Sequence, residues 1–404
     1  MKVMDDNQRV LLTLIENALW LKSAKVSAAD WEKVEKMAKE QGVLWMLYLG
    51  AKKISNQIPL ECLRSWRAIM HSAVVFNEQI NIVQNELLDW LFQEQIPAVI
   101  LKGMSCSRYY PYPEARSLGD IDILINKENY RAVDYYLRQR GYSPSKTEHD
   151  FHVGYYGKET VIEVHFAGTS LPKSSCSQRI IEEMNRFIEE RQDVIVNDMR
   201  FPVLSDTHQA LMLLLHKERH MLEDGIGLRQ LCDWCTFVGG ETSSHWEEGT
   251  LELLGECGLL TYAKVLTKAC VKYLGLNCKS APWCEDVDEK LADAMIMEVF
   301  RGGSMGKAEQ EGMSGLFIDR SVLGQSIQSR MKGLIVSLNT IAYKNWPKVK
   351  KHKLLLPLCW LYLPLRYWVR TLFGIRPKKH VSKIVNAATQ RQTLYSALHL
   401  YEAE

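Results

Sequence analysis

Hydrophobic residues recur with a helical period over the first 95 positions of the chain. Apolar side chains return every three or four residues in "NQRVLLTLIENALW", in "AADWEKVEKMAKEQGVLWMLYLGAKK" and in "FNEQINIVQNELLDWLFQEQ". This spacing is typical of amphipathic helices. Asp30 precedes the second segment and suits an N-terminal cap. Residues 1–95 are therefore expected to form an N-terminal helical region.

The pattern changes between residues 96 and 205. "IPAVILKG" and "DIDILI" are short apolar runs of the kind found in buried strands, and "FHVGYYGKETVIEVHF" alternates like a β-hairpin. "MSCSRYY" and "KENYRAVDYYLRQRGY" have helical character, and Gly141 suits the end of the second helix. "VIVNDMRFPVLS" adds further strand-like residues. This part of the chain predicts a small α/β domain.

The helical period returns at Asp206 and continues to about residue 300. The glycine-rich stretch "RGGSMGKAEQEGMSG" that follows indicates a loop or a domain junction. Beyond it the chain is basic, and four prolines interrupt its apolar clusters. We therefore expect a helical domain at 206–300 that closes a cleft, and a mostly helical C-terminal region at 301–404.

Composition narrows the class of protein. The 404 residues are 47% hydrophobic and 24% charged, as is usual for a soluble globular protein. The net charge of +2 argues against nucleic acid as a partner of the whole molecule. No secretory signal precedes the first helix, and no apolar run reaches the ~20 residues of a spanning helix. A cytoplasmic protein with reduced cysteines is expected.

The basic C-terminal region departs from this average. Residues 301–404 hold 17 Lys and Arg against 5 Asp and Glu. Within them, 344–379 combines basic ends with tryptophans and a short apolar middle. A packed terminal element is the favoured interpretation. Contact with a membrane surface, which would make the protein peripheral at the inner membrane, and contact with a polyanion are the alternatives.

Two acidic residues interrupt the apolar run "DIDILI". Alternate side chains of a strand point to the same face, so Asp120 and Asp122 project together while the isoleucines project toward a core. Two carboxylates held close repel each other and are costly to bury. Mg²⁺ prefers oxygen ligands and often brings phosphates with it. The pair predicts a Mg²⁺ or Mn²⁺ site, with an exposed strand edge as the alternative.

A third carboxylate and several donors lie in segments that the fold can bring near this pair. Glu163, in the alternating run "VIEVHF", would share the metal or take a proton from an attacking hydroxyl; a salt bridge is the alternative. The Lys102-Gly103 turn would offer backbone N–H groups to an anion. Ser105 and Arg116 would add donors to a triphosphate, although Arg116 also suits an ion pair with an acid.

Several histidines are further candidates. His165 lies on the Glu163 side of its strand, where it would orient a carboxylate, contact substrate or fill space. His149 and His152, just before the hairpin, are weaker candidates. His216 and His220 are spaced to bind zinc from one helix, but "HKERH" lacks the glutamate position of the known zinc motif.

One later helix has residues that would face the same cleft. His216, Arg229 and Asp233 would line it from the helical side. Arg229 and Asp233 are also spaced as an ordinary ion pair on a helix. The segment "CDWC" has the form C-x-x-C, but no second such pair follows it.

The ordered set of these segments resembles a known family. "LKG", "GDIDILI", "RGY" and "IEVHF", followed by "LLHKERH" and "GIGLRQLCDW", are similar to the uncharacterised bacterial nucleotidyltransferases of the DNA polymerase β-like superfamily. The resemblance covers about 10–240. It places Asp120 and Asp122 on the paired metal ligands, Glu163 on the third carboxylate and Lys102-Gly103 on the glycine turn. Lys-Gly-Met-Ser replaces the Gly-Gly or Gly-Ser doublet that is usual in the superfamily.

The resemblance implies an α+β fold in which a small mixed sheet at 96–205, flanked by helices, lies between helical regions. It also implies two divalent cations and transfer of a nucleoside monophosphate from an NTP. The acceptor would supply a hydroxyl, amine or phosphate and is not identified. The altered glycine turn favours an alternative, a nucleotidyltransferase-fold binding protein without transfer activity.

Overall fold

The computed structural model divides the chain into two compact units. One comprises Met1–Met221, Gly225–Gly306 and His399–Glu404, and the other Leu222–Asp224 and Lys307–Leu398. The structure describes residues 4–303 apart from 146–150, 167–170, 172–173, 197–198, 224 and 241–247, together with short stretches between 339 and 402. Most of the glycine-rich stretch and residues 363–379 of the basic segment lie outside the described residues.

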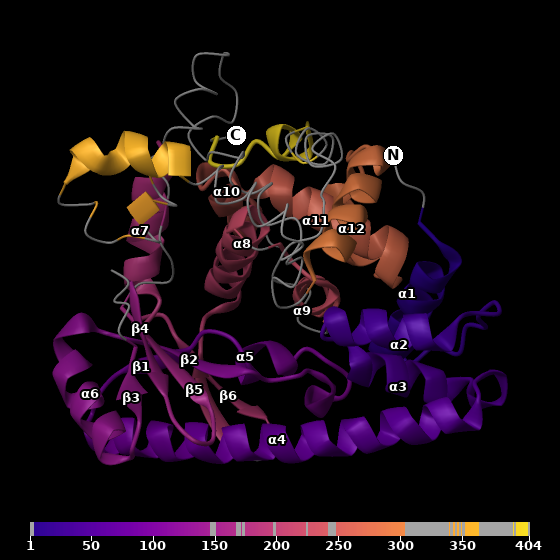
Figure 1. Cartoon of the computed structure of the whole chain (residues 1–404), viewed down its shortest axis with the longest axis horizontal. Coiled ribbons are helices and arrows are strands. Elements are labelled where there is room, and N and C mark those ends of the chain that lie inside the picture. Colours follow the sequence, from indigo (N-terminus) through magenta and orange to yellow (C-terminus); the bar gives the residue numbers. More distant parts are fainter. Residues whose placement is uncertain are drawn as a thin grey trace. The chain divides into compact units, whose positions relative to one another are not determined.

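The N-terminal region is helical, as its period predicts. Its helices are α1 (Asp6–Leu19), α2 (Trp31–Glu40), α3 (Leu44–Lys53) and α4 (Leu60–Gln93). The Asp30 carboxylate caps α2 by accepting from the Lys33 backbone N–H. The 34-residue helix α4 runs from α3 to the sheet (Figure 1) and thus joins the helical region to the rest of the unit.

A seven-stranded sheet follows in the described part of the chain. Its strands are β1 (Ala98–Ile100), β2 (Asp120–Ile125), β3 (Ser143–Pro144), β4 (His152–Tyr156), β5 (Val161–His165), β6 (Gln192–Val196) and β7 (Met199–Val203). Their order is β3-β4-β5-β2-β1-β7-β6. Because β2 pairs parallel with β5 and antiparallel with β1, the sheet is mixed. The α+β prediction and the β4–β5 hairpin are confirmed.

One face of this sheet is apolar and covered by helices. Ile121, Ile123 and Ile125 pack there with Ile162 and Val164. Apolar side chains of α4 and of α6 (Tyr130–Gln139) complete this core. The strict alternation of β2 therefore sends its isoleucines into the core and its aspartates to the opposite face.

The remaining helices are α5 (Met104–Ser107), α7 (Ser177–Arg186), α8 (Asp206–Glu223), α9 (Leu228–Gly239), α10 (Glu248–Glu256), α11 (Leu260–Leu274) and α12 (Glu289–Gly302). Short 3₁₀ turns occupy Ser55–Gln57, Pro113–Ala115, Lys127–Asn129, Cys278–Ser280, Pro282–Cys284 and, in the second unit, Lys353–Leu355. Helix α11 packs on α9 and α12. Within the described residues, no helix has the length and apolar character needed to cross a membrane.

Candidate active site

Three carboxylates project from the polar face of the sheet. In the parallel ladder of β2 and β5, Asp122 lies directly opposite Glu163. Asp120 is two residues before Asp122, and His165 is two residues after Glu163, so all four side chains belong to the same face. We call Asp120, Asp122, Glu163 and His165 the carboxylate cluster.

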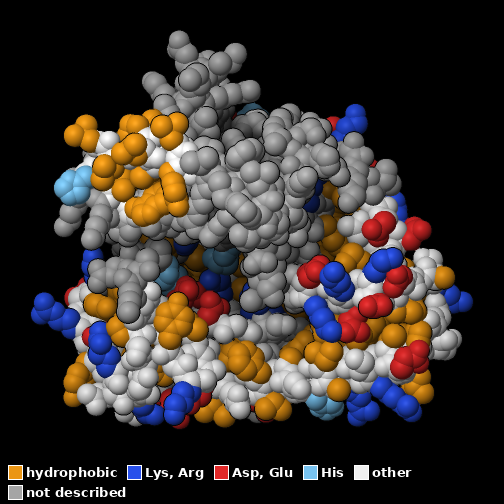
Figure 2. Space-filling model, viewed as in Figure 1, with side chains coloured by type: hydrophobic (Ala, Val, Ile, Leu, Met, Phe, Trp, Pro, Cys, Tyr) orange, Lys and Arg blue, Asp and Glu red, His pale blue; other side chains and the backbone are white. Residues whose placement is uncertain are grey.

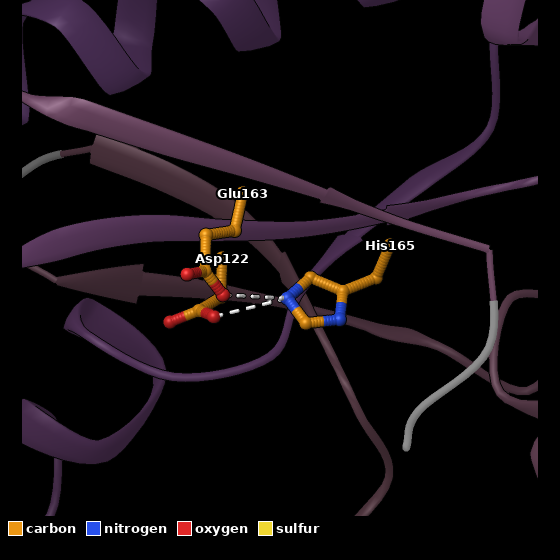
Figure 3. Close-up of side chains that lie close together, drawn as sticks. All are labelled: Asp122, Glu163 and His165. Atoms are coloured by element: carbon orange, nitrogen blue, oxygen red, sulfur yellow. Dashed lines mark hydrogen bonds and ion pairs between the residues drawn. The ribbon is translucent and has the colours of Figure 1, made fainter. Parts of the chain in front are cut away.

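His165 bridges two of these carboxylates (Figure 3). Its Nε2 lies 3.1 Å from Asp122 Oδ1 and 3.4 Å from Glu163 Oε2. Ionised carboxylates only accept hydrogen bonds, so Nε2 carries the proton. His152, opposite His165 in the hairpin, stacks on its ring with centroids 5.1 Å apart. The hairpin therefore fixes the imidazole that orients the two acids.

Lys102 reaches the cluster from the end of β1. Its Nζ donates to Asp122 Oδ1 at 2.8 Å and to His216 Nε2 at 2.9 Å. His220 Nε2 lies 3.0 Å from the same His216 nitrogen. Because an ammonium only donates, His216 Nε2 is the acceptor and His220 Nε2–H the donor. A continuous series of hydrogen bonds thus links helix α8 to strand β2 through the Lys102 side chain.

The charges of the cluster follow from these contacts. Burial alone would raise the pKa of Asp122, but the Lys102 ammonium and the His165 N–H hold it well below its usual range. Burial would lower the pKa of His165, but its hydrogen bonds to Asp122 and Glu163 raise it. The charge of Asp122, together with burial, raises the pKa of Asp120. Asp120 is therefore the carboxylate that the apoprotein accommodates least well.

Several polar atoms of the cluster lack a hydrogen-bond partner among the described residues. Asp122 Oδ2 and His165 Nδ1 are buried without one, and the Asp120 carboxylate has neither a hydrogen bond nor an ion pair within that part of the chain. Buried polar atoms normally find partners. Asp122, Glu163 and His165 each offer one ligand atom within 4.8 Å of the others. Two carboxylates and an imidazole suit Mn²⁺, and the carboxylates suit Mg²⁺.

A second charged network lies between the loop before β2 and helix α9, beside the same cavity that Asp120 and Asp122 line. Arg116 donates to Asp233 through Nε at 2.7 Å and through Nη2 at 3.0 Å, and the Tyr110 hydroxyl donates to Asp233 Oδ1 at 2.8 Å. Burial would raise the pKa of Asp233, but the Arg116 guanidinium lowers it. We call Arg116, Tyr110 and Asp233 the arginine–aspartate network. It ties the loop before β2 to α9.

The other predicted donors take different positions. Arg229 lines the cavity and makes one long contact, from Nη1 to the Ser117 carbonyl at 3.4 Å. Asp233 pairs with Arg116 rather than with Arg229, its neighbour at helical spacing. Ser105 is buried and donates to Gln209 Oε1 at 2.7 Å, so its hydroxyl is already engaged.

The glycine turn has the backbone conformation that its sequence suggests. Gly103 has φ +65°, which disfavours side chains, and a Cβ there would lie 3.9 Å from the Asp120 carbonyl oxygen. The helix that follows, α5, is only four residues long. The Lys102 side chain, rather than the end of this helix, therefore provides the positive charge nearest to Asp122.

A cavity of about 140 Å³ separates the two walls. Its charged and imidazole side chains come from β2 and the loop before it, from the turn before α5 and from helices α8 and α9: Lys102, Arg116, Asp120, Asp122, His216, Lys217, His220, Arg229 and Asp233. All of them belong to the first unit. The cavity therefore has carboxylates on the sheet side and cations around it.

A comparison with known protein families identifies the family of this chain. A model of an uncharacterised nucleotidyltransferase family matches residues 27–275, more than half of the chain. The chain belongs to this family. The matched part of this nucleotidyltransferase family member contains the carboxylate cluster, the arginine–aspartate network and the cavity, and it ends before Lys307, where the longer segment of the second unit begins. No curated protein matches the chain.

Sequence reasoning missed Lys217, which lines the cavity of this family member, and Tyr110, which donates to Asp233. Lys217 is buried, and burial lowers its pKa to about 8. Its signal was present: in "LLLHKERHML" it stands four residues after Leu213 and four before Met221, on their buried face. Tyr110 had no comparable signal, because its partner Asp233 is 123 residues away.

Proposed function

We propose that this protein transfers a nucleoside monophosphate from an NTP to an acceptor hydroxyl, amine or phosphate. The observation that carries the proposal is the group of three carboxylates on one sheet face, with buried atoms that the described residues leave without partners. Membership of a nucleotidyltransferase family supports the same reaction class.

The carboxylate cluster fits a divalent cation. Asp120, Asp122 and Glu163 would hold it, with His165 orienting Asp122 and Glu163. When bound, Mg²⁺ or Mn²⁺ would neutralise phosphate charge and the repulsion between the carboxylates. Asp122 Oδ2 is open even while Lys102 pairs with Oδ1. The protein thus keeps a ligand atom in place before any substrate arrives.

The cations around the cavity suit a triphosphate. Among the described residues Arg229 makes a single, long hydrogen bond, which leaves most of its N–H groups for a phosphate. Lys102 donates to Asp122 and can turn to a phosphate once that carboxylate is otherwise neutralised. The cavity of about 140 Å³ is smaller than the ~300–1,000 Å³ of typical ligand pockets. It suits the phosphates, and the nucleoside is expected to extend beyond it.

Glu163 is the residue best suited to activate the acceptor. Its side chain is 29% exposed, whereas that of Asp122 is 1% exposed. Burial would raise the pKa of Glu163, but the His165 hydrogen bond lowers it, so the group is ionised at neutral pH. An ionised, accessible carboxylate can accept a proton from an attacking hydroxyl or amine.

A nucleotide-binding protein without transfer activity is the second candidate. The observation that favours it is the Lys102–Asp122 ion pair, which neutralises a predicted metal ligand internally. In that case the protein would bind an NTP and release it unchanged. The two candidates differ in whether pyrophosphate is formed.

The test uses the four NTPs, each labelled at the α-phosphate, with Mg²⁺ or Mn²⁺ and a small-molecule cell extract as the source of acceptors. Transfer predicts that pyrophosphate is released and that the label moves to a new product. A folded Asp120→Asn/Asp122→Asn variant is expected to form neither. Metal-dependent NTP binding without pyrophosphate release in any extract would contradict transfer and support the second candidate.

A further inference from the structure

The second unit has a helical segment that is apolar on both sides. Residues 356–362 are helical and follow the 3₁₀ turn Lys353–Leu355. Leu356 packs with Ala342 and Val349 in a small core, against which Trp346 and Trp360 lie half-buried. The other side of the segment consists of exposed apolar residues.

The exposed residues form one stripe. Leu354 is 95% exposed, Leu358 64% and Leu361 72%, and Leu355 and Tyr362 also face solvent. Positions 354, 358 and 361 recur at the four- and three-residue spacing of one helix face. Figure 2 shows these hydrophobic side chains gathered on the face in view. Contiguous exposed apolar surface of this kind marks an interaction site.

Charge indicates what covers this surface. From Arg320 to Tyr401, with Arg320 included, the sequence contains 15 Lys and Arg and no Asp or Glu. Four lysines, at positions 348, 350, 351 and 353, immediately precede the leucine stripe. The rest of the chain has 35 Lys and Arg (50 − 15) against all 48 Asp and Glu. The positive charge is therefore concentrated around a segment in which several leucines are exposed together.

We propose that the leucine stripe at 354–362, in a stretch of sequence rich in lysine, docks the protein onto an anionic lipid bilayer. The leucine stripe would enter the boundary between headgroups and acyl chains, and the lysines would contact the anionic headgroups. A nucleic acid would satisfy the lysines but would leave the leucines in water, so the stripe favours the bilayer. Tryptophans at positions 346 and 360 suit the same interface, where one end of the ring is wet.

Two exposed residues outside the stripe supply the control, and the lysines supply a second test variant. Phe92 is 83% exposed and Ile195 75% exposed, and both belong to the first unit. A Phe92→Ser/Ile195→Ser variant removes exposed apolar surface without touching the stripe. A Lys350→Glu/Lys351→Glu/Lys353→Glu variant removes the charge and leaves the leucines.

The experiment is sedimentation of the full chain with vesicles of phosphatidylcholine alone or with one quarter phosphatidylglycerol. The chain is expected to sediment with the anionic vesicles only, and to leave them in 1 M salt, where the screening length falls to about 3 Å. Leu354→Ser/Leu358→Ser/Leu361→Ser and the lysine variant are each expected to weaken binding at least about tenfold. The Phe92→Ser/Ile195→Ser control is expected to bind like the wild type.

Two results would overturn the proposal. One is a wild-type chain that stays in the supernatant with anionic vesicles. The other is a leucine variant that sediments like the wild type while the lysine variant does not, because this would show a purely electrostatic polyanion site. A single-stranded oligonucleotide bound equally by the wild type and the leucine variant, with no vesicle binding, would assign the surface to nucleic acid.

Discussion

The two walls of the cavity carry charged groups that differ in how well they are satisfied. In the arginine–aspartate network, both oxygens of Asp233 accept from Arg116, and Tyr110 donates a third hydrogen bond. In the carboxylate cluster, Asp122 Oδ2 and His165 Nδ1 are buried without partners in the described structure. One network is complete within the chain, whereas the other has unused ligand atoms.

This difference separates the charged groups that stabilise the fold from the charged groups that bind a ligand. A buried pair with all its hydrogen bonds made holds elements together, and breaking it is costly. Buried carboxylates with open oxygens are costly as they stand, and such groups persist where a ligand completes them. Arg116 and Asp233, which the sequence offered as substrate contacts, therefore serve the fold in this interpretation, and Asp120, Asp122 and Glu163 serve the chemistry.

The largest effect is expected from Asp122→Asn. The amide keeps an oxygen that accepts from Lys102 but removes the charge that a divalent cation requires. Pyrophosphate release is expected to fall by about 10³-fold, a loss typical of removing one electrostatic group from an active site. The melting temperature is also expected to fall, because the largely buried Lys102 ammonium loses the counter-charge of Asp122. A folded variant with wild-type turnover would remove Asp122 from the chemistry.

Asp233→Asn is expected to act on stability instead. It leaves the buried Arg116 guanidinium without a counter-charge, which costs about 3–5 kcal/mol. Urea unfolding measures the loss. The matched control is Glu86→Gln, which breaks the exposed Arg140–Glu86 pair, with side chains 52% and 54% exposed, and is expected to cost less than about 1 kcal/mol. Equal losses in the two variants would mean that the network is not a structural lock.

Glu163→Gln sharpens the roles within the carboxylate cluster. If Glu163 accepts a proton in the transition state, turnover is expected to fall by about 10²-fold while NTP affinity changes little. Steady-state kinetics with varied NTP, beside direct titration, separates the two. A loss of affinity as large as the loss of turnover would make Glu163 a metal ligand only.

The smallest effect is expected from Lys217→Met, which removes a buried cation that lines the cavity. Burial lowers the pKa of Lys217 from 10.5 to about 8, so folding disfavours its ammonium form. The wild type is therefore expected to be about 1–2 kcal/mol less stable than the variant at pH 7, after its hydrogen bond to Leu213 is allowed for. The gap is expected to narrow as the pH rises from about 8 toward 10.5, because the folded protein then holds a neutral amine. A gap that stays constant as the pH rises would show that folding does not lower the pKa of Lys217.

The local pattern of apolar and polar residues predicted the strands and helices well. The alternation of "DIDILI" and "VIEVHF" placed Asp120, Asp122 and Glu163 on strands, and the hairpin before Glu163 followed from its two alternating runs. Helix α4 begins at Leu60, ahead of the segment whose period was clearest. Its first half is exposed on most sides, so the hydrophobic period there is weak.

The sequence did not predict the ion pairs between residues that lie far apart in the chain. The i,i+4 spacing of Arg229 and Asp233 suggested an ion pair, but Asp233 instead takes Arg116, 117 residues away, through two parallel hydrogen bonds. A bidentate guanidinium pair outcompetes a single helical contact. Likewise, Lys102 belonged to a predicted backbone turn, and only the fold shows its side chain on Asp122.

The central claim is that the carboxylate cluster binds the nucleotide through a divalent cation, and that the arginine–aspartate network does not bind it. Calorimetric titration of the four NTPs, with and without Mg²⁺, into the wild type, Asp120→Asn and Asp233→Asn tests it most directly. The account predicts metal-dependent binding of at least one NTP to the wild type. It predicts that Asp120→Asn loses this binding without melting lower, since the substitution removes a repelled charge, and that Asp233→Asn melts lower yet binds below its melting temperature. Unchanged NTP affinity in Asp120→Asn, or lost affinity in an Asp233→Asn variant of unchanged stability, would contradict it.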